Sequence, residues 1–500
     1  MSAVLSIDRI SMRYAQNLSE GNGLVWNPGD KVEGITNLLM TFFMAASQFI
    51  LGGRASILFL QISGIFLILT NALVIMKISR FIFHNDKSMT NETHATTAFA
   101  LGILFYPLNY WALMGMETGL LALLVSCLYF TVLKNVEKAE ISWPFIWLII
   151  LSFLTRPDAP AILIPAIIYR EYHLIKISKR TIPAIELTTV ATLMAMIFLA
   201  RYTYYGEIVP NTYILKVTGM PLLDRISNGA NFTKPFIISF SLPIILATIN
   251  IIRSYSKEKL ILFAAFFCAV LYQIWVGGDA WDYWRFVSPA VPLLLLLTIR
   301  PLMRFSGKIP QSQIEPNTWY NKVGFTRTVF VSLLLFLVFI PSNFQFRKQI
   351  SFNKKPFQTK SNRINYDTAL ILKYICSDKA TVGVFWAGTI PYVSGLTAYD
   401  MLGKNDKYIA RLSPDPQVAW ANMKGVPGHN KYDLEYSIKG KQPTYVQDYK
   451  WWKQNMYDYV MANYIIVQEG DLEMYLRKDS DEVRWERLRI VSKGRYTVIW

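Results

Sequence analysis

Charged residues, cysteines and histidines are scarce in this 500-residue sequence. Asp, Glu, Lys and Arg make up only 17% of the chain, whereas soluble domains usually carry about 25%. Cys127 and Cys268 lie in apolar runs and Cys376 stands alone in a polar region, which excludes a readable disulfide framework or thiolate metal site. The four histidines form no cluster. The sequence therefore predicts no metal and no other cofactor.

Apolar residues are correspondingly abundant. Hydrophobic residues make up 53% of the chain and aromatic residues 14%, with a mean hydropathy of +0.27, which indicates an integral membrane protein. The formal net charge of +17 comes from Lys and Arg scattered between apolar segments, without a basic stripe or a recognisable nucleic-acid module. We therefore expect a lipid bilayer with anionic headgroups as a partner, and no nucleic acid.

Ten apolar runs read as membrane spans, although several are shorter than the roughly 20 residues of a straight crossing. A further apolar run at 36–51 follows a polar segment directly and is interpreted as a helix lying at the membrane interface. The predicted spans are residues 56–79, 95–113, 116–134, 141–156, 158–175, 184–204, 235–252, 259–276, 287–304 and 326–341.

The distribution of Lys and Arg orients these spans. One alternate set of connections is rich in cations, for example at Arg170, Lys176, Lys257 and Lys259, and is predicted to be cytoplasmic. The N-terminal segment and the tail after residue 341 then face outward. Because residues 1–9 are too short to cross a bilayer and resemble no signal peptide, we expect the start codon to fall inside a longer frame, with one more transmembrane helix upstream.

The tail has the composition of a separate domain. Segments such as ATVGVFWAG, NYIIVQ and RYTVIW read as buried strands and YDTALILKYICS as an amphipathic helix, so we expect an α/β exterior domain. Its aromatic cluster could stack on sugars or pack in a core. The cluster comprises Tyr449, Trp451, Trp452, Tyr457 and Tyr459. The predicted domains are 1–55, an exterior loop with an interfacial helix; 56–341, the transmembrane domain; and 342–500, the exterior domain.

Charged residues also occur in four connections that are predicted to face outward. Ionisable groups near membrane depth are costly, by about 2.5 to 3.5 kcal/mol on insertion scales, and clustered ones usually line a polar cavity. Local ion pairs that cap helices, such as Arg156 with Asp158 or Asp282 with Arg285, are the alternative explanation. The residues are Glu117 in MGMETG, Arg156 and Asp158 around Pro157, Asn211 and Lys216 in YYGEIVPNTYILK, and Asp279, Asp282 and Arg285 in GGDAWDYWRFVSP.

In their order and spacing, these blocks resemble the GT-C glycosyltransferases that use lipid-linked sugars, most closely the mycobacterial terminal arabinofuranosyltransferase family. The resemblance implies a polytopic α-helical membrane fold and a polyprenyl phosphate sugar as donor, with arabinofuranose as the sugar. It also implies transfer to a glycan or glycoprotein acceptor outside the cytoplasm. The blocks are RYAQNLSEGNGLVWNPGDKVEGITN, MGMETG, TRPDAP, YYGEIVPNTYILK, GGDAWDYWRFVSPAVP, GTIPYVSGLTAYDMLGKND and PGHNKYD.

The resemblance also implies roles for single residues. Lys216 and Arg285 would hold the donor phosphate with Arg156, and Asp158 and Asn211 complete the predicted donor site. Asp279 and Glu117 would line the sugar pocket and are, with Asp8, the predicted catalytic residues. Arg13, Tyr14, Asn27, Pro28 and Glu33 would belong to an exterior loop that closes over the donor.

The family's acidic pair ahead of the RYA block is displaced in this chain. The pair falls at Ser6 and Ile7, and Asp8 comes one position later. Three explanations stay open: Asp8 serves as the base in a shifted register, the acids lie upstream, or the protein is inactive. Two alternative functions accompany the glycosyltransferase prediction, namely a transporter or flippase for a lipid-linked sugar, although no internal repeat is apparent, and a catalytically inactive membrane binding protein.

Overall fold

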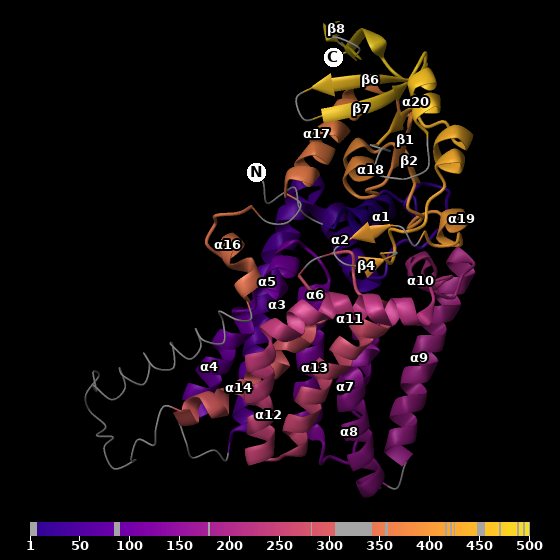
Figure 1. Cartoon of the computed structure of the whole chain (residues 1–500). Coiled ribbons are helices and arrows are strands. Elements are labelled where there is room, and N and C mark those ends of the chain that lie inside the picture. The colour runs from indigo at the N-terminus through magenta and orange to yellow at the C-terminus, as the bar shows by residue number, and fades with distance from the viewer. Residues whose placement is uncertain are drawn as a thin grey trace. The chain divides into compact units, whose positions relative to one another are not determined.

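The computed structural model divides the chain into two compact units (Figure 1). The first, which we call the sheet unit, consists of Met1–Leu60, Ile197–Asp224 and Pro356–Trp500. The second, the helical unit, consists of Gln61–Met196 and Arg225–Lys355. The structure describes residues 8–84, 91–178, 181–281, 283–305, 343–355, 359–415, 418–420, 423–424, 426–447, 456–469, 472–487, 490–493 and 496–499.

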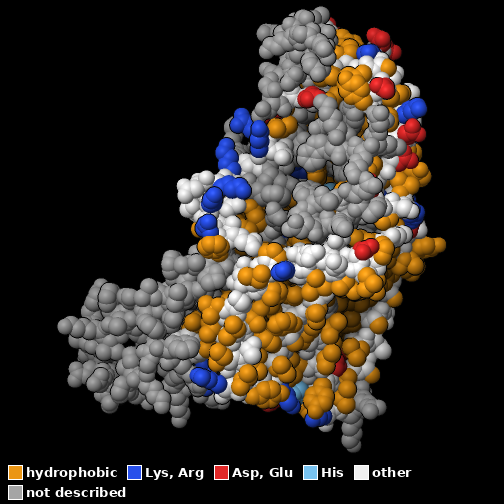
Figure 2. Space-filling view, viewed as in Figure 1, with side chains coloured by type: hydrophobic (Ala, Val, Ile, Leu, Met, Phe, Trp, Pro, Cys, Tyr) orange, Lys and Arg blue, Asp and Glu red, His pale blue; other side chains and the backbone are white. Residues whose placement is uncertain are grey.

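The helical unit is a bundle of apolar helices. In it α8 packs against α13, α14 packs against α12 and α13, and α6 packs against α7 (Figure 1). Figure 2 shows the apolar side chains that these helices leave on the surface. The helices that lie wholly or partly in this unit are α3 (Gly53–Ile82), α4 (Asn91–Ile103), α5 (Tyr106–Leu113), α6 (Thr118–Asn135), α7 (Trp143–Thr155), α8 (Pro160–Ser178), α9 (Thr181–Tyr205), α11 (Leu222–Ser239), α12 (Ser241–Arg253), α13 (Lys257–Val276), η2 (Ser288–Ala290), α14 (Val291–Phe305), η4 (Phe344–Phe346) and α16 (Arg347–Ile350).

Among the described residues, four helices are individually long and apolar enough to cross a membrane: α3, α6, α9 and α13. Helices α11 and α12 meet the same criteria as a pair but bend by 72° where they join. Several apolar helices, including α7, are shorter. The polytopic helical character is therefore present, whereas the number of ten spans stays a prediction. The predicted span 326–341 lies outside the described residues.

Two predicted spans differ from the observed helices. The run 95–113 is divided into α4 and α5, because Pro107 lies in the first turn of α5 and cannot continue a preceding helix. The run 235–252 is likewise interrupted at Phe240 and continues N-terminally as α11, which includes the polar stretch DRISNGANFTK. The sequence did not predict α11 because its composition is polar. A helix needs only one apolar face to pack against its neighbours, and the opposite face can be polar.

The sheet unit contains a mixed five-stranded sheet of order β2-β1-β5-β7-β6. Strand β1 pairs in parallel with β2 and β5, and β7 pairs antiparallel with β5 and β6. The elements of this unit are α1 (Arg9–Ser19), α2 (Leu38–Leu51), α10 (Asn211–Val217), α17 (Thr359–Ile375), β1 (Thr381–Val384), α18 (Thr389–Ser394), β2 (Thr397–Asp400), α19 (Lys407–Ala410), β3 (Ala419–Trp420), β4 (Met423–Lys424), η5 (Glu435–Gly440), β5 (Tyr445–Val446), α20 (Tyr457–Asn463), β6 (Tyr464–Glu469), β7 (Leu472–Arg477), η6 (Trp485–Arg487), β8 (Ile490–Lys493) and β9 (Tyr496–Ile499).

The polar N-terminal segment forms part of the core of the sheet unit. Tyr14 and Trp26 are buried in the same hydrophobic cluster as side chains of β1, α17 and α18. Arg13 donates hydrogen bonds to the carbonyl oxygens of Trp26, Pro391 and Leu396. The side chain of Asn27 exchanges two hydrogen bonds with the backbone of Ala398 in β2. These side chains thus cover the edge of the sheet. Arg13 and Tyr14 belong to the helix α1, where the sequence predicted a loop.

Other sequence expectations concern α2 and the aromatic cluster. The apolar run 36–51 forms the 14-residue helix α2, which leaves Phe49 and Ile50 more than three quarters exposed. Its interfacial position and the division into domains 1–55, 56–341 and 342–500 stay predictions. Of the proposed sugar-stacking residues, Tyr449, Trp451 and Trp452 lie outside the described residues, and Tyr457 is 57% exposed at the start of α20.

Candidate functional site

Five predicted site residues lie at the ends of apolar helices in the helical unit. Glu117 directly precedes α6, Arg156 terminates α7, and Asp158 lies in the turn before α8. Asp279 follows the end of α13, and Arg285 precedes η2 and α14. Proline 157 disfavours a helical conformation for the residue before it, and Arg156 is accordingly extended, with φ −156° and ψ 127°.

The guanidinium of Arg156 holds two carboxylates. Its Nε and Nη2 atoms donate to the two carboxylate oxygens of Asp158 at 2.7 and 2.9 Å, and Nη1 donates to Oε1 of Glu117 at 2.7 Å. Glu117 is 2% exposed and Arg156 is 9% exposed. The local Arg156–Asp158 ion pair that the sequence offered as an alternative is therefore present, but it is one half of a three-residue network. Such a network links the ends of α6, α7 and α8.

A second ion pair lies in the loop between α13 and η2. Arg285 donates from Nε to Oδ2 of Asp279 at 2.7 Å and from Nη2 to Oδ1 at 3.3 Å. Asp279 is 3% exposed. Within the part of the chain that the structure describes, Nη1 of Arg285 makes no hydrogen bond, so this guanidinium can still donate to a ligand. Asp282, the other predicted partner of Arg285, lies outside the described residues.

Phe286 joins the two groups. Its ring centroid lies 4.0 Å from Cζ of Arg156 and 4.6 Å from Cζ of Arg285, both within the range of cation–π interactions. The cluster of Glu117, Arg156, Asp158, Asp279 and Arg285 has a formal charge of 2 − 3 = −1. Three carboxylates can accept hydrogen bonds from the hydroxyl groups of a sugar. To bind a phosphate, the cluster would need the remaining donors of Arg285 and a further cation.

The loop that carries Asp279 and Arg285 has an unusual backbone. Tyr283 and Trp284 adopt positive φ angles of 72° and 43°, which are disfavoured for bulky residues. Surrounding contacts hold this conformation: Nε1 of Trp111 donates to the carbonyl oxygen of Tyr283 at 3.1 Å, and the rings of Tyr110 and Tyr283 lie 4.7 Å apart. Strained backbone of this kind is concentrated at functional sites.

Sequence patterns did not identify Phe286, Trp111 or Tyr283 as site residues. Phe286 directly follows Arg285 in the sequence, but its ring also contacts Arg156, which lies far away along the chain. The only signal in the sequence for Phe286 as a site residue is that this aromatic residue adjoins a predicted site cation.

The predicted base Asp8 is the N-cap of α1 in the sheet unit. Its carboxylate accepts hydrogen bonds from the backbone nitrogen and the hydroxyl of Ser11, at 3.3 and 2.7 Å, and from Nδ2 of Asn37 at 3.2 Å. An aspartate at this position stabilises a helix whether or not it takes part in a reaction. The structure thus gives Asp8 a structural role that the sequence reading did not include.

Asn211 and Lys216 lie on α10, also in the sheet unit. Nδ2 of Asn211 donates to the carbonyl oxygens of Gly403, Lys404 and Asp406, so this amide fixes the loop before α19. Lys216 lies beside Gly428 of the PGHNKYD block, where an added Cβ would meet the lysine side chain at 3.4 Å. Two blocks far apart in the sequence therefore meet at α10. Glu33, from the N-terminal block, forms a buried ion pair with Arg201 at 2.7 Å.

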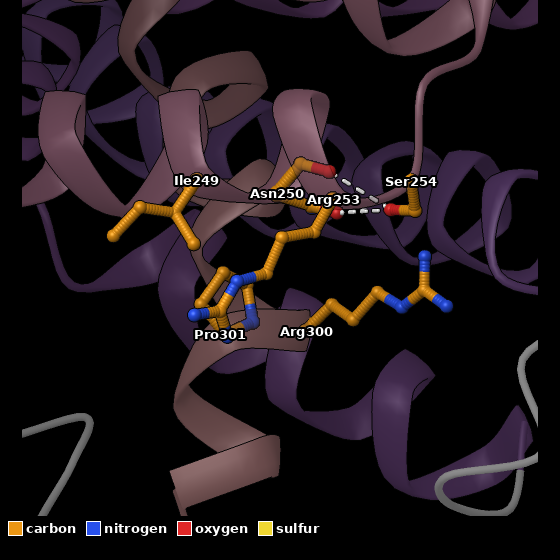
Figure 3. Close-up of a pocket in the computed structure, with 6 residues that line it drawn as sticks. All are labelled: Ile249, Asn250, Arg253, Ser254, Arg300 and Pro301. Carbon is orange, nitrogen blue, oxygen red and sulfur yellow. Dashed lines mark hydrogen bonds between the residues drawn. The ribbon is translucent and has the colours of Figure 1, made fainter.

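A small cleft lies between the C-terminal parts of α12 and α14. Arg253 ends α12, and Arg300 is near the end of α14, whose beginning follows Arg285. Figure 3 shows that the side chains of Arg253 and Arg300 extend in opposite directions around Pro301, while Ser254 donates to Asn250. No acidic side chain lines this cleft. Among the described residues, no three His, Cys, Asp or Glu side chains are grouped as metal ligands.

Comparisons with known proteins bear on the fold. Residues 354–498 match a family model described as a domain of unknown function, DUF8728. No curated protein matches the chain. The structure is similar to ArnT from Cupriavidus metallidurans, in the apo state with 14% identity and a TM-score of 0.50, and bound to undecaprenyl phosphate with 12% identity and a TM-score of 0.51. Both matches cover 80% of this chain and 83% of ArnT.

A third solved structure is the archaeal oligosaccharyltransferase AglB from Archaeoglobus fulgidus in complex with an inhibitory peptide and a dolichol-phosphate. It is 11% identical with a TM-score of 0.50, over 99% of this chain and 72% of AglB. At these identities the likeness establishes the fold. The chain has the fold of ArnT and AglB, and the resemblance to GT-C glycosyltransferases and to the arabinofuranosyltransferase family stays a prediction.

Proposed function

We propose that the chain is a membrane glycosyltransferase that moves a sugar from a polyprenyl phosphate donor to a glycan or protein acceptor outside the cytoplasm. The sequence resemblance suggests arabinofuranose as the sugar. The observation that carries the proposal is the buried cluster around Phe286, which combines three carboxylates and two guanidiniums at the ends of apolar helices. Solved structures of the same fold bind undecaprenyl phosphate and dolichol-phosphate, which supports a lipid-linked donor.

In the proposed reaction, an acceptor hydroxyl oxygen forms a bond to the anomeric carbon of the sugar. The bond between that carbon and the phosphate oxygen breaks, its electron pair stays on the oxygen, and polyprenyl phosphate leaves. A carboxylate takes the proton of the acceptor hydroxyl. The leaving phosphate gains a second negative charge in this step. A cation beside it therefore stabilises the transition state more than the bound donor, which is the condition for catalysis.

Arg285 is the residue of the cluster best suited to the phosphate. Its Nη1 is available within the described residues, whereas Arg156 already uses three donors on Glu117 and Asp158. We assign to Arg156 the task of holding those two carboxylates in place. Glu117 and Asp279 would accept hydrogen bonds from sugar hydroxyls. The sequence resemblance suggests Lys216 as a further cation for the phosphate.

The direct test supplies the full chain, in membranes, with a labelled polyprenyl phosphate arabinose and an acceptor glycan. Release of polyprenyl phosphate and label in the acceptor would support the proposal. Parallel donors that carry mannose or an aminosugar would identify the sugar. No transfer from any pentose or hexose donor, including by a chain extended upstream, would exclude the enzyme.

One observation favours a second function, a catalytically inactive membrane binding protein. All the described hydrogen bonds of Asp8 are to Ser11, in the helix cap, and to Asn37. These contacts give its carboxylate a structural role that requires no catalysis. This alternative predicts that the chain binds the polyprenyl phosphate sugar without releasing polyprenyl phosphate. Equilibrium binding of labelled donor, measured beside turnover, separates the two functions.

A further inference from the structure

The segment of residues 343–355, NFQFRKQISFNKK, which we call the basic segment, concentrates positive charge on the surface. Arg347, Lys348, Lys354 and Lys355 are all exposed, and the segment contains no Asp or Glu. Figure 2 shows Lys and Arg side chains gathered over α16, which lies in this segment (Figure 1). The sequence places these four cations on the outer side of the membrane, just after the predicted span 326–341, where the positive-inside rule leads us to expect few. Their presence there requires another physical reason.

Two phenylalanines of the basic segment are also exposed. Phe344 is 54% exposed and Phe352 is 96% exposed, although neighbouring Phe346 is only 3% exposed. Phe352 has a φ of 59°, a left-handed conformation that is costly for a bulky residue and that ends the short α16 turn. Cζ of Arg347 lies 4.2 Å from the ring centroid of Phe344. Exposed aromatic rings interleaved with cations are typical of surfaces that lie at the boundary between lipid headgroups and acyl chains.

The basic segment is held on a fixed base within the helical unit. Asn343 accepts a hydrogen bond from the backbone nitrogen of Tyr106 at 2.8 Å and donates to the carbonyl oxygen of Leu104 at 3.2 Å. The ring of Phe346 lies 5.2 Å from that of Tyr106 and 4.6 Å from that of Tyr283. The exposed cations and rings therefore project from an anchored turn, whose backbone is already ordered before it binds a surface.

We propose that the basic segment binds the phosphate headgroups of anionic phospholipids, with Phe344 and Phe352 inserted at the level of the acyl chains. The inference rests on the membrane placement in the proposed function, but not on catalysis. Four cations without a carboxylate complement anionic headgroups. A soluble acidic glycan would also attract the cations, but it would leave both phenylalanines in water. The aromatic residues thus favour a lipid as the occupant.

The test uses the full chain purified in detergent micelles that contain phosphatidylglycerol and phosphatidylcholine. The phosphatidylglycerol that stays bound per chain is quantified by mass spectrometry of extracted lipids, without donor or acceptor. The segment variant carries Arg347→Gln, Lys348→Gln, Lys354→Gln and Lys355→Gln. The matched control carries Lys360→Gln, Arg363→Gln, Lys373→Gln and Lys379→Gln, which remove the same charge from exposed positions in or near α17.

We expect the segment variant to retain less than half of the phosphatidylglycerol of the unchanged chain, and the control variant to retain all of it. Phe352→Ser, which keeps every charge, should also reduce retention and provides a second test if the fourfold variant does not fold. Equal retention by the segment variant and the unchanged chain, or an equal loss in the control, would overturn the proposal. So would loss of binding to soluble polygalacturonate with unchanged lipid retention. Because no transfer is measured, these outcomes are independent of the glycosyltransferase proposal.

Discussion

Arg156 and Arg285 share one aromatic ring, because their Cζ atoms lie 4.0 and 4.6 Å from the centroid of Phe286. Two guanidiniums this close to one ring would repel each other if they were alone. The three carboxylates of Glu117, Asp158 and Asp279 offset that repulsion. The ring is therefore in contact with both ion-pair networks.

Replacement of Phe286 should consequently disturb both networks. Each cation–π contact contributes about 0.5 to 2 kcal/mol, depending on its exposure, and Phe286→Leu removes two of them while keeping most of the apolar volume. We expect a lower apparent melting temperature in detergent and slower sugar transfer. Phe286→Tyr keeps an aromatic ring of nearly the same size and serves as the control. Equal effects of the leucine and tyrosine variants would show that ring packing, and not the cation contacts, decides the outcome.

The Arg285–Asp279 pair provides a test of the proposed pocket. Arg285→Ala alone would leave the buried Asp279 carboxylate without its cation, so lost activity could reflect misfolding. The double variant Arg285→Gln with Asp279→Asn removes both charges and keeps groups that can hydrogen bond. We expect it to fold but to lose transfer by roughly 100-fold or more, the usual effect of removing a transition-state donor. Transfer at the original rate by a folded double variant would place the pocket elsewhere.

Asp8 can be tested for chemistry and capping separately. Asn is about as good an N-cap as Asp, whereas Ala at this position costs about 1 kcal/mol. Asp8→Asn should therefore keep the N-cap of α1, with a small loss in melting temperature because its amide nitrogen cannot accept the hydrogen bond from Asn37. It should abolish transfer if Asp8 takes the acceptor's proton. Asp8→Ala should lower both the melting temperature and the rate of transfer. Full turnover by the Asn variant would show that Asp8 only caps the helix and that another residue is the catalytic base.

The sequence predicted most of the apolar helices well, for a physical reason. The runs 116–134 and 259–276 are uninterrupted apolar stretches with charged residues or glycine at their ends. Helices α6 and α13 begin and end within a few residues of these two runs. Helix α1 was missed because its composition is polar. Its buried face depends on Tyr14 packing against segments hundreds of residues away, which no local pattern contains.

The candidate site was predicted in part for similar reasons. Charges at the ends of apolar runs are visible in sequence, so Glu117, Arg156 and Arg285 could be named. Phe286 could not be named, since its contact with Arg156 joins two segments that lie far apart in the sequence. Nor could the contact between Asp8 and Asn37 be foreseen, because these residues lie 29 positions apart along the chain.

A buried ion pair away from the cluster should matter for stability and not for transfer. Arg170 donates to both carboxylate oxygens of Glu186 at 2.9 and 2.7 Å, and both side chains are at most 1% exposed. Arg170→Ala should cost about 3 to 5 kcal/mol, because it leaves a buried carboxylate unpaired.

The exposed pair Arg411–Glu207 is the matched control for Arg170. Its side chains are 42% and 28% exposed, so Arg411→Ala should cost no more than about 1 kcal/mol. Apparent melting temperatures of both variants in detergent measure the difference. Similar shifts in the two variants would show that the Arg170–Glu186 pair contributes no more than a surface contact.

Stability should also depend on pH through Asp400, in the sheet unit. Burial raises the pKa of this carboxyl from 3.8 to about 6, although the backbone and side chain of Asn405 donate hydrogen bonds to it. Between these two values the folded chain holds a proton that the unfolded chain releases. The contribution of Asp400 is therefore most favourable below about pH 4, falls as the pH rises through 6, and is constant above it. The total change is on the order of 3 kcal/mol.

Comparison with Asp400→Asn isolates this contribution, because burial also raises the pKa of Asp30 and Glu33 and gives them a pH dependence of the same sign. The variant does not titrate at position 400. Its second polar atom becomes a donor that faces the donors of Asn405, so it should be less stable at every pH. Apparent melting temperatures measured from pH 4 to 7 should fall less steeply for the variant than for the unchanged chain. Parallel curves would mean that Asp400 is already ionised in the folded protein at pH 4, with its hydrogen bonds outweighing its burial.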